Sequence, residues 1–431
     1  MGDAPSPSRL GPLRAFAYPQ FRILWGASLA SITAFFMVMM ARGWLVLELT
    51  DSAFMVTAVN AVGMLPMLAL SLFGGVIADR MNRRLVLMAS DAFNMVVVLA
   101  QGLLVVAGVE QVWPVFALAV LNGVGFALGM PARAATVSNV VNPRDLSSGV
   151  ALFTTIFSSA QMVGPALAGY LINVHGMWAP FMVSGVLLVP ALALLTALRV
   201  PVARTTRKGA PSESILDSIL GGLDYVRQRP VLVGLMLMGL VATVFGMPFQ
   251  TLLPVFARDI LHVGASGLGW LGGLGGVGAL AGSLTVAFFS NPRQMRLLLV
   301  TGGIGLGVFI AFFALSTLYP LSLALVLILG FLLQIFMTSN FTLVQVTSPD
   351  HVRGRVMSIR MVALGMGPVG MFLLGVGVQV MGPAYATAVM GAIALLLMLL
   401  VLVAVPSLRR VEADVEDAAT VQAEEFRSPA Q

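Results

Sequence analysis

Cysteine is absent from this chain, and charged residues and histidines are scarce. Without cysteine the protein has no disulfide, no thiol nucleophile and no cysteine-bound metal. Only 10% of the 431 residues are charged, far below an average soluble domain. His175, His262 and His351 do not have a metal-ligand spacing. No phosphate loop of the form Gly-x-x-x-x-Gly-Lys-Ser/Thr occurs, so an ATPase is disfavoured. We therefore expect no metal, no cofactor and no enzyme activity.

What the chain has instead is long apolar runs. Hydrophobic residues make up 58% of it, and its mean hydropathy is +0.97. A helix that crosses a membrane needs about 20 mostly apolar residues. Twelve such runs lie near 21–47, 53–78, 85–108, 112–131, 148–173, 178–199, 231–256, 265–290, 296–316, 319–345, 357–380 and 384–405. The sequence predicts an all-α polytopic membrane protein with about twelve transmembrane helices.

The runs fall into two sets of six, separated by a polar connector that is expected to hold one amphipathic helix near 215–226. Residues 206 positions apart match between the sets, including Gly164 with Gly370 and Pro143 with Pro349. This internal repeat predicts two pseudo-symmetric bundles. The predicted divisions are an N-terminal segment 1–20, a six-helix bundle 21–199, a connector 200–229, a second bundle 230–405 and a tail 406–431.

The basic residues fix the predicted orientation. If both termini are cytoplasmic, all of the 24 Lys and Arg except Arg42 and Arg258 fall on the cytoplasmic side. This is the positive-inside pattern of membrane proteins. The net charge of +6 comes from short clusters between apolar runs, so we do not expect nucleic acid as a partner.

A short hydrophilic hinge separates the second and third runs. Gly75 allows close approach of two backbones there. The charges of Asp79, Arg80, Arg83 and Arg84 follow it within nine residues. An aspartate can accept hydrogen bonds from a helix N-terminus, and arginines can pair with acids or carbonyls on neighbouring helices. These residues are candidates for a gate; the alternative is that they only mark a membrane boundary.

The pattern Gly-x-x-x-Asp-Arg-x-x-Arg-Arg resembles the signature loop of the major facilitator superfamily of transporters. The usual glycine before the arginine pair is Asn82 here. The resemblance implies two six-helix bundles that rock around a central cavity. It also implies that the hinge closes the cytoplasmic side in the outward-open state.

A second pattern lies in the fifth run, where Ala160, Gly164, Ala168 and Gly169 form a face of small residues and Pro165 allows a bend. It resembles the Gly-x-x-x-Gly-Pro-x-x-Gly-Gly motif of exporters and antiporters in the superfamily, with alanine in place of two glycines. The resemblance implies a gating role for Gly164, Pro165 and Gly169. The alternative is ordinary packing of a bent helix.

Further motifs resemble the branch that contains enterobactin-exporter-like bacterial permeases. Members of this branch often carry an aspartate in the first helix, where this chain has Phe35. The resemblance covers about 21–405 and implies a bacterial cytoplasmic membrane. The matching segments are Phe21-Arg22-x-Leu24-Trp25, Arg42-Gly43-Trp44-Leu45-Val46-x-Glu48-Leu49-Thr50 and Arg353-Gly354-Arg355-Val356-x-Ser358.

Two ionisable residues lie within the predicted membrane helices, where they are costly and therefore candidates for function. Arg42 cannot release its proton. It either binds an anionic substrate or pairs with Glu48 or Asp51. Asp91 is a candidate proton-coupling site, since partial burial raises the pKa of a carboxyl group. Its alternative role is that of a counterion for the nearby arginines of the hinge.

Neutral polar side chains also interrupt the apolar runs, where they need partners or water. In the resembling fold, helices 1, 4, 7 and 10 line the central cavity, which favours four of these side chains over Asn60 and Gln161. The favoured substrate-binding candidates are Asn122, Gln250, Gln334 and Asn340.

We therefore predict a secondary transporter that exports an amphipathic small molecule, such as a siderophore or drug-like compound, in exchange for protons. Its expected partners are the substrate, protons and the lipid bilayer, and it is expected to work as a monomer. Two alternatives stay open. One is an uptake permease or facilitator for a small nutrient, and the other is a membrane sensor or scaffold without transport.

Overall fold

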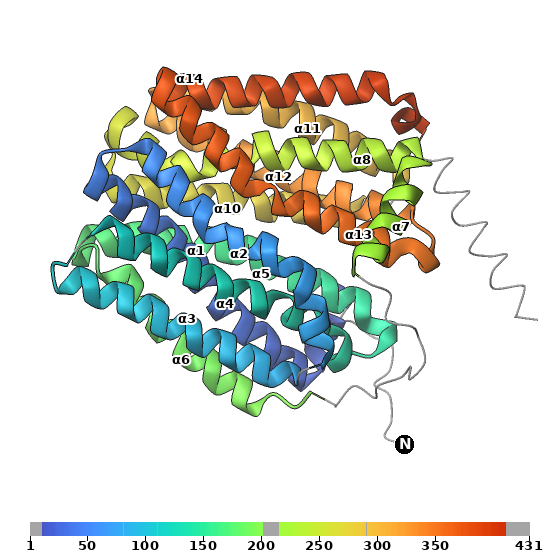
Figure 1. The fold of residues 1–431 in the computed structure, drawn as a ribbon, viewed down its shortest axis with the longest axis horizontal. Coiled ribbons are helices and arrows are strands. Elements are labelled where there is room, and N and C mark those ends of the chain that lie inside the picture. The colour runs from blue at the N-terminus through green and yellow to red at the C-terminus, as the bar shows by residue number, and fades with distance from the viewer. Residues whose placement is uncertain (1–10, 81, 110, 201–214, 290, 411–431) are drawn as a thin grey trace, which may run out of the picture.

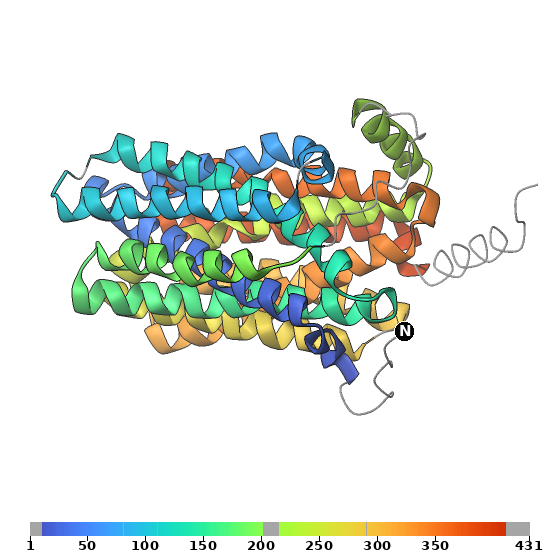
Figure 2. The same ribbon diagram turned by 90° about the horizontal axis from the view of Figure 1, so that it is seen from below.

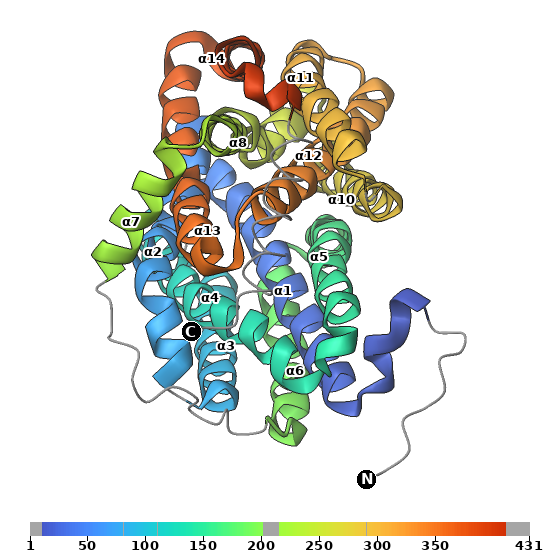
Figure 3. The same cartoon turned by 90° about the vertical axis from the view of Figure 1, so that its right-hand side faces the viewer.

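The structure is a computed structural model that describes residues 11–80, 82–109, 111–200, 215–289 and 291–410. All regular elements in these ranges are helices, which confirms the predicted fold class. The helices form two groups that lie one above the other in Figures 1 and 3. We call them the N-terminal half, residues 11–200, and the C-terminal half, residues 215–410.

The N-terminal half consists of six long helices that follow one short helical turn. Apolar runs become helices in lipid because a helix satisfies its own backbone hydrogen bonds. The elements are η1 (Gly11–Ala17), α1 (Pro19–Thr50), α2 (Ala53–Arg80), α3 (Arg83–Val106), α4 (Val112–Val140), η2 (Pro143–Asp145), α5 (Leu146–His175) and α6 (Ala179–Ala197).

The C-terminal half begins with the predicted connector helix, and its first spanning segment is broken into five short elements. The elements are α7 (Ile215–Arg227), α8 (Pro230–Val241), η3 (Ala242–Gly246), η4 (Pro248–Leu252), α9 (Leu253–Val255), η5 (Phe256–Ile260), α10 (Gly264–Phe288), α11 (Pro292–Leu315), α12 (Tyr319–Val346), α13 (Asp350–Gly365), α14 (Gly367–Ala404) and η6 (Pro406–Arg410).

Ten stretches of the described chain are long and apolar enough to cross a membrane. An eleventh, Ala53–Ala69, is apolar but shorter. The stretch Val352–Ala404 holds 53 residues, enough for two crossings, and bends at Gly382, whose φ of 80° is left-handed. The twelve predicted helices are consistent with this pattern.

Helix boundaries follow most predicted runs closely, but the fourth, seventh and eleventh runs differ, since the seventh is broken and the eleventh is divided between α13 and α14. The sequence predicts that the fourth run ends at 131, but α4 continues through Pro131 to Val140. A proline inside a membrane helix is tolerated when neighbouring helices satisfy the freed backbone groups. Asn82 and Asn291 begin α3 and α11 in the same way, because each side chain accepts a hydrogen bond from the backbone N–H two residues later.

The two ends of the molecule are packed differently. The end that carries α7, η1 and η6 is here called the α7 end, and the opposite end is called the distal end (Figures 1 and 2). One apolar core at the distal end contains buried residues of both halves, such as Leu45 and Phe256. Toward the α7 end, each half has a separate core of its own. The halves are therefore joined mainly at the distal end.

Candidate substrate cavity

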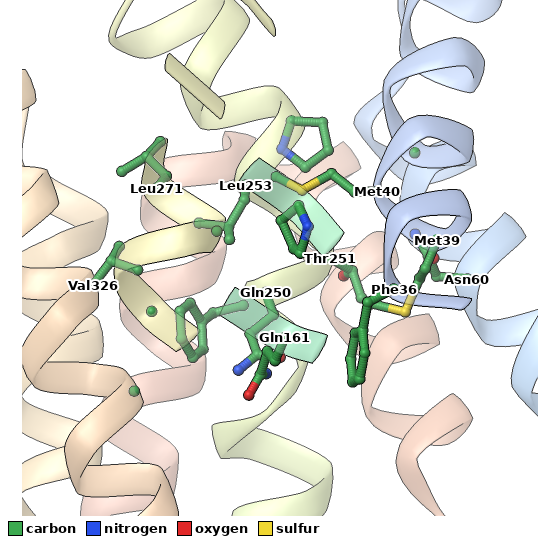
Figure 4. Close-up of a pocket in the computed structure, with 17 residues that line it drawn as sticks. Phe36, Met39, Met40, Asn60, Gln161, Gln250, Thr251, Leu253, Leu271 and Val326 are labelled. Atoms are coloured by element: carbon green, nitrogen blue, oxygen red, sulfur yellow. The ribbon is translucent and has the colours of Figure 1, made fainter. Parts of the chain in front are cut away.

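A cavity lies between the two halves (Figure 4). The N-terminal half contributes α1, α2 and α5 to its wall, and the C-terminal half contributes η4, α9, α10 and α12. Ligand sites in proteins are concave and commonly lie between domains or between the helices of a bundle. The position of this cavity, between the two halves, is that of a ligand site.

The wall is mostly apolar and rich in flexible or aromatic side chains. Phe36, Met39 and Met40 line it from α1, and Phe249 and Leu253 line it from the opposite half. Methionine side chains adapt to irregular shapes because they are unbranched and polarizable. Such a wall suits apolar molecules of varied shape.

Four polar side chains face this apolar wall. Asn60 and Thr251 already donate hydrogen bonds to the carbonyls of Val56 and Pro248, at 2.9 and 2.7 Å. Gln161 on α5 and Gln250 on η4 also line the cavity, and Figure 4 labels both. Neither carboxamide has a hydrogen bond or other polar interaction with a described residue. Two unused hydrogen-bonding groups, one from each half, therefore line the same cavity.

The irregular seventh spanning segment explains how Gln250 reaches this position. Between α8 and α10 the chain changes from α-helix to a π-helical turn, a 3-10 turn and a second π-helical turn. Pro248 and Pro254 lack backbone N–H groups and prevent a continuous helix there. Irregular backbone at membrane depth is tolerated where it is enclosed by protein or lines a cavity. The break presents Phe249, Gln250 and Thr251 to the cavity.

Charged residues join the halves at the distal end. Arg258 of η5 forms an ion pair with Asp51, the C-cap of α1, with 2.9 Å between Nη1 and Oδ1. The same Nη1 donates a hydrogen bond to the Leu47 carbonyl at 2.9 Å. Asp51 has a left-handed φ of 48°, which aspartate tolerates better than most residues. We call this pairing of Arg258 with α1 the distal latch.

A buried ion pair lies inside the N-terminal half. Asp91 of α3 pairs with Arg133 of α4, and their side chains are only 1% and 3% exposed. Ser31 of α1 donates a hydrogen bond to the second carboxylate oxygen of Asp91 at 2.7 Å. Three helices of one half therefore meet at a single carboxylate. Arg133, and not an arginine of the hinge, is the counterion of Asp91, which corrects the alternative role predicted for it.

A second, smaller cavity adjoins this pair. Asn122 lines it and donates a hydrogen bond to Asn94 at 3.1 Å. Phe35 and Phe126 also line it, stacked with ring centroids 3.9 Å apart. Phe35 and Asp91 therefore face the same space. The first-helix position Phe35, where the resemblance implied an aspartate, is apolar, and the carboxylate beside this cavity comes from α3.

The predicted binding residues are distributed over several places. Of the five, only Gln250 lines the central cavity. Arg42 is buried and bonds to Gln101 at 3.1 Å, and not to either predicted acid.

The other candidates also have partners within their own half. Gln334 donates to Thr338 at 3.0 Å. Asn340 donates to the Leu235 carbonyl at 2.8 Å and accepts a longer bond from Arg360. Asn122 lines the small cavity and bonds to Asn94. All four candidates other than Gln250 therefore bond to side chains or backbone of their own half.

The predicted gating residues of the hinge are described in part. Gly75, Asp79 and Arg80 fall in the last turns of α2, whose side chains lie outside the described part of the structure. Arg83 donates to the carbonyl of Ala135 and to the Asn139 side chain, both at 2.9 Å. Arg84 donates to the carbonyls of Leu195 and Thr196. These contacts link α3 to α4 and α6 within the N-terminal half.

The small residues of α5 face two different neighbours. A Cβ at Gly164 would lie 2.9 Å from Cβ of Phe36 on α1, and a Cβ at Gly169 would lie 2.6 Å from Cα of Gly269 on α10. Pro165 lines the cavity beside Gly272 of α10. The small residues of α5 therefore pack against α1 of the N-terminal half and against α10 of the C-terminal half.

Two residues that the structure brings into the site are not among the candidates that the sequence favours. Gln161 ranks below other candidates because helix 5 is not expected to line the cavity. Arg133 resembles a boundary charge when the fourth run is predicted to end at 131. A signal for Arg133 is nevertheless present, since small and apolar residues continue to Val137 without another charge.

Comparisons with known proteins decide the family. A family model described as transmembrane secretion effector matches residues 8–429. The chain belongs to this family, a branch of the major facilitator superfamily. The predicted transporter class is confirmed, and the protein is a multi-pass membrane transporter and not an enzyme.

Curated members of the superfamily resemble this chain over most of its length. It is 31% identical to the multidrug efflux pump Tap of Mycolicibacterium fortuitum over 381 residues, which cover 86% of this chain and 91% of Tap. It is 24% identical to the enterobactin exporter EntS of Citrobacter koseri, over 89% and 92% of the two chains. Both relatives are named as efflux proteins, which supports the predicted export.

The fold is shared with transporters of known structure. The crystal structure of a mutant of the nucleoside transporter NupG superposes with a TM-score of 0.69 at 14% identity, over 89% of this chain and 99% of NupG. At this identity the likeness shows the major facilitator fold alone.

Proposed function

We propose that this protein exports an amphipathic small molecule from the bacterial cytoplasm in exchange for protons, by alternating access to one cavity. The observation that carries the proposal is a cavity built by two halves whose described residues share a packed core mainly at the distal end. Rocking of the halves changes which end of such a cavity is accessible. The efflux relatives support the outward direction.

The α7 end faces the cytoplasm in this proposal. The positive-inside rule supports this orientation, because the hinge arginines, the α7 connector, η1 and η6 belong to that end. The cavity is complete within one chain, so a monomer suffices. The protein then resides in the cytoplasmic membrane, and the structure corresponds to the inward-facing state.

Proton coupling is assigned to Asp91. Protonation of its carboxylate removes the charge that holds Arg133 and weakens the link between α3 and α4. Ser31, which bonds to the same carboxylate, lies on α1 just over one turn before Phe36 of the cavity wall. A change at Asp91 can therefore move the helix that contacts the substrate. Protonated and ionised Asp91 would then favour different conformations of the protein, and such a difference is what lets proton binding shift the population between them.

The gate at the cytoplasmic side is assigned to the hinge. Arg83 and Arg84 bond within their own half in the present state. When the halves close at the α7 end, the hinge with Gly75, Asp79 and Arg80 would meet the other half. Gly164, Pro165 and Gly169 would let α5 slide against α1 and α10 during this motion, since small residues permit close helix contact.

Inside-out membrane vesicles with a preformed inside-acid pH gradient test the proposal. Transported compounds should dissipate the gradient in wild-type vesicles and fail to do so with Asp91→Asn. Asp79→Asn should also abolish transport while membrane insertion is unchanged. Substrate flux without any loss of the gradient would contradict proton coupling, and flux with the dependence on pH unchanged in Asp91→Asn would remove the assignment to this residue.

A further inference from the structure

We infer that the transported molecule is uncharged and is held between Gln161 and Gln250, one carboxamide from each half. This inference rests on the proposed export function and specifies its substrate class. It is carried by two observations about the central cavity, which are its unused carboxamides and the absence of ionisable side chains among the described residues that line it.

The carboxamides are the hydrogen-bonding groups that the cavity leaves open. The polar side chains of Asn60 and Thr251 already donate to the backbone of their own helices. Gln161 and Gln250 have no polar partner among the described residues, although they face an apolar space. A polar group there costs free energy until a ligand or water satisfies it. A carboxamide both donates and accepts, so the pair fits carbonyl, hydroxyl and amide groups.

Charged groups of the same region are already engaged elsewhere. Arg42 bonds to Gln101 and does not line the cavity. Asp91 and Arg133 neutralise each other beside the smaller cavity. A charged ligand in the central cavity would lose its hydration without gaining a counterion. An uncharged ligand avoids this cost, so the cavity selects against both anions and cations.

The shape of the wall adds a second requirement. Phe36 and Phe249 approach from opposite halves, with Met39 and Met40 beside them. Aromatic and thioether side chains favour ring systems. The substrate class is therefore an uncharged aromatic or alicyclic molecule that carries neighbouring carbonyl, hydroxyl or amide groups.

The position of the two carboxamides also explains why binding would respond to the conformational state. Gln161 belongs to α5 and Gln250 to the broken seventh segment, so the two halves carry one each. Rocking of the halves changes their separation. A molecule that bonds to both carboxamides is then bound more tightly in one conformation than in the other. A ligand shifts the population between two conformations only through such a difference in affinity.

Compounds that differ in charge test this inference in inside-out vesicles with an inside-acid gradient. Radiolabelled chloramphenicol is uncharged, chloramphenicol hemisuccinate adds a carboxylate to the same skeleton, and tetraphenylphosphonium is a permanent cation. We expect pH-dependent accumulation of chloramphenicol alone. Accumulation of either charged compound at an equal or higher rate overturns the inference and leaves proton-coupled export intact. No pH-dependent accumulation of any of the three overturns both proposals.

Side-chain variants test the two carboxamides directly. Gln161→Leu and Gln250→Leu should each raise KM for chloramphenicol about three- to tenfold, as expected for one lost hydrogen bond, while kcat and its pH dependence stay unchanged. Gln250→Glu should make tetraphenylphosphonium a substrate, because it places a carboxylate in the wall. The control is Gln111→Leu, an exposed carboxamide on a distal loop. An unchanged KM in both leucine variants rejects the assignment.

Discussion

Asp91 and Arg133 show at the level of single residues how a buried charge is kept in a membrane helix. Each is almost inaccessible, and each compensates the other. Removing one member of a buried pair leaves an uncompensated charge, which typically costs about 3–5 kcal/mol, whereas replacing both can be neutral. Stability and coupling can therefore be separated at this site by experiment.

We expect Arg133→Leu to lower the stability of the purified protein by about 3–5 kcal/mol, because Asp91 is left without its counterion. The double variant Asp91→Asn with Arg133→Leu should recover most of that loss and still lack pH-driven transport. Thermal unfolding in detergent, followed by tryptophan fluorescence, measures the first effect, and vesicle transport measures the second. Recovery of coupled transport in the double variant would show that the pair is only structural.

The same residues show what the sequence predicts and what it does not. Asp91 is found from the sequence because a carboxylate in an apolar run is conspicuous. Its partner is hidden, since Pro131 suggests a helix end and Arg133 then resembles one more boundary charge. The choice between Gln161 and Asn122 depends on which way each helix is rotated in the bundle. That rotation is fixed by contacts between helices, which a single sequence does not record.

Among the elements, the broken seventh segment performs two tasks. Its 3-10 turn η4 carries Gln250 into the cavity, and its second π-helical turn η5 carries Arg258 to α1. Both positions require a departure from a straight α-helix. The apolar run at 231–256 predicts a single regular helix. Hydropathy indicates whether a segment is long enough to span the membrane, and it contains no information about breaks in the helical backbone.

The distal latch should control access from the distal side. Asp51→Asn removes the ion pair with Arg258, so we expect the cavity to open to that side more often. The chain has no cysteine, so Thr251→Cys supplies a single thiol in the cavity wall. A membrane-impermeant maleimide applied from the distal side should label it about three to ten times faster in Asp51→Asn, which corresponds to about 1 kcal/mol.

Glu48→Gln is the matched control for the latch. Glu48 accepts a hydrogen bond from Trp44 on its own helix at 2.6 Å and forms no ion pair with the described residues of the other half. Equal labelling rates in the Asp51 and Glu48 variants would mean that Arg258 does not restrain the distal side.

At the scale of the whole molecule, the apolar runs predict the all-helical membrane fold correctly. Lipid requires every spanning segment to satisfy its own backbone, so the number and order of apolar runs determine the number and order of helices. The cavity cannot be derived in this way. It depends on how the two halves meet, and the packing of α5 against α10 and of Gly169 against Gly269 appears only when the chain is folded.

Under the proposed exchange with protons, the uncharged wall of the central cavity determines which gradients drive transport. Exchange of a neutral molecule for one proton carries one net positive charge across the bilayer, so the process is electrogenic. A membrane potential of 100 mV then contributes about 2.3 kcal/mol per proton, even where the pH is equal on both sides. In inside-out vesicles, a lumen-positive potassium diffusion potential should alone cause chloramphenicol to accumulate. An exchange of one cation for one proton would not respond to that voltage.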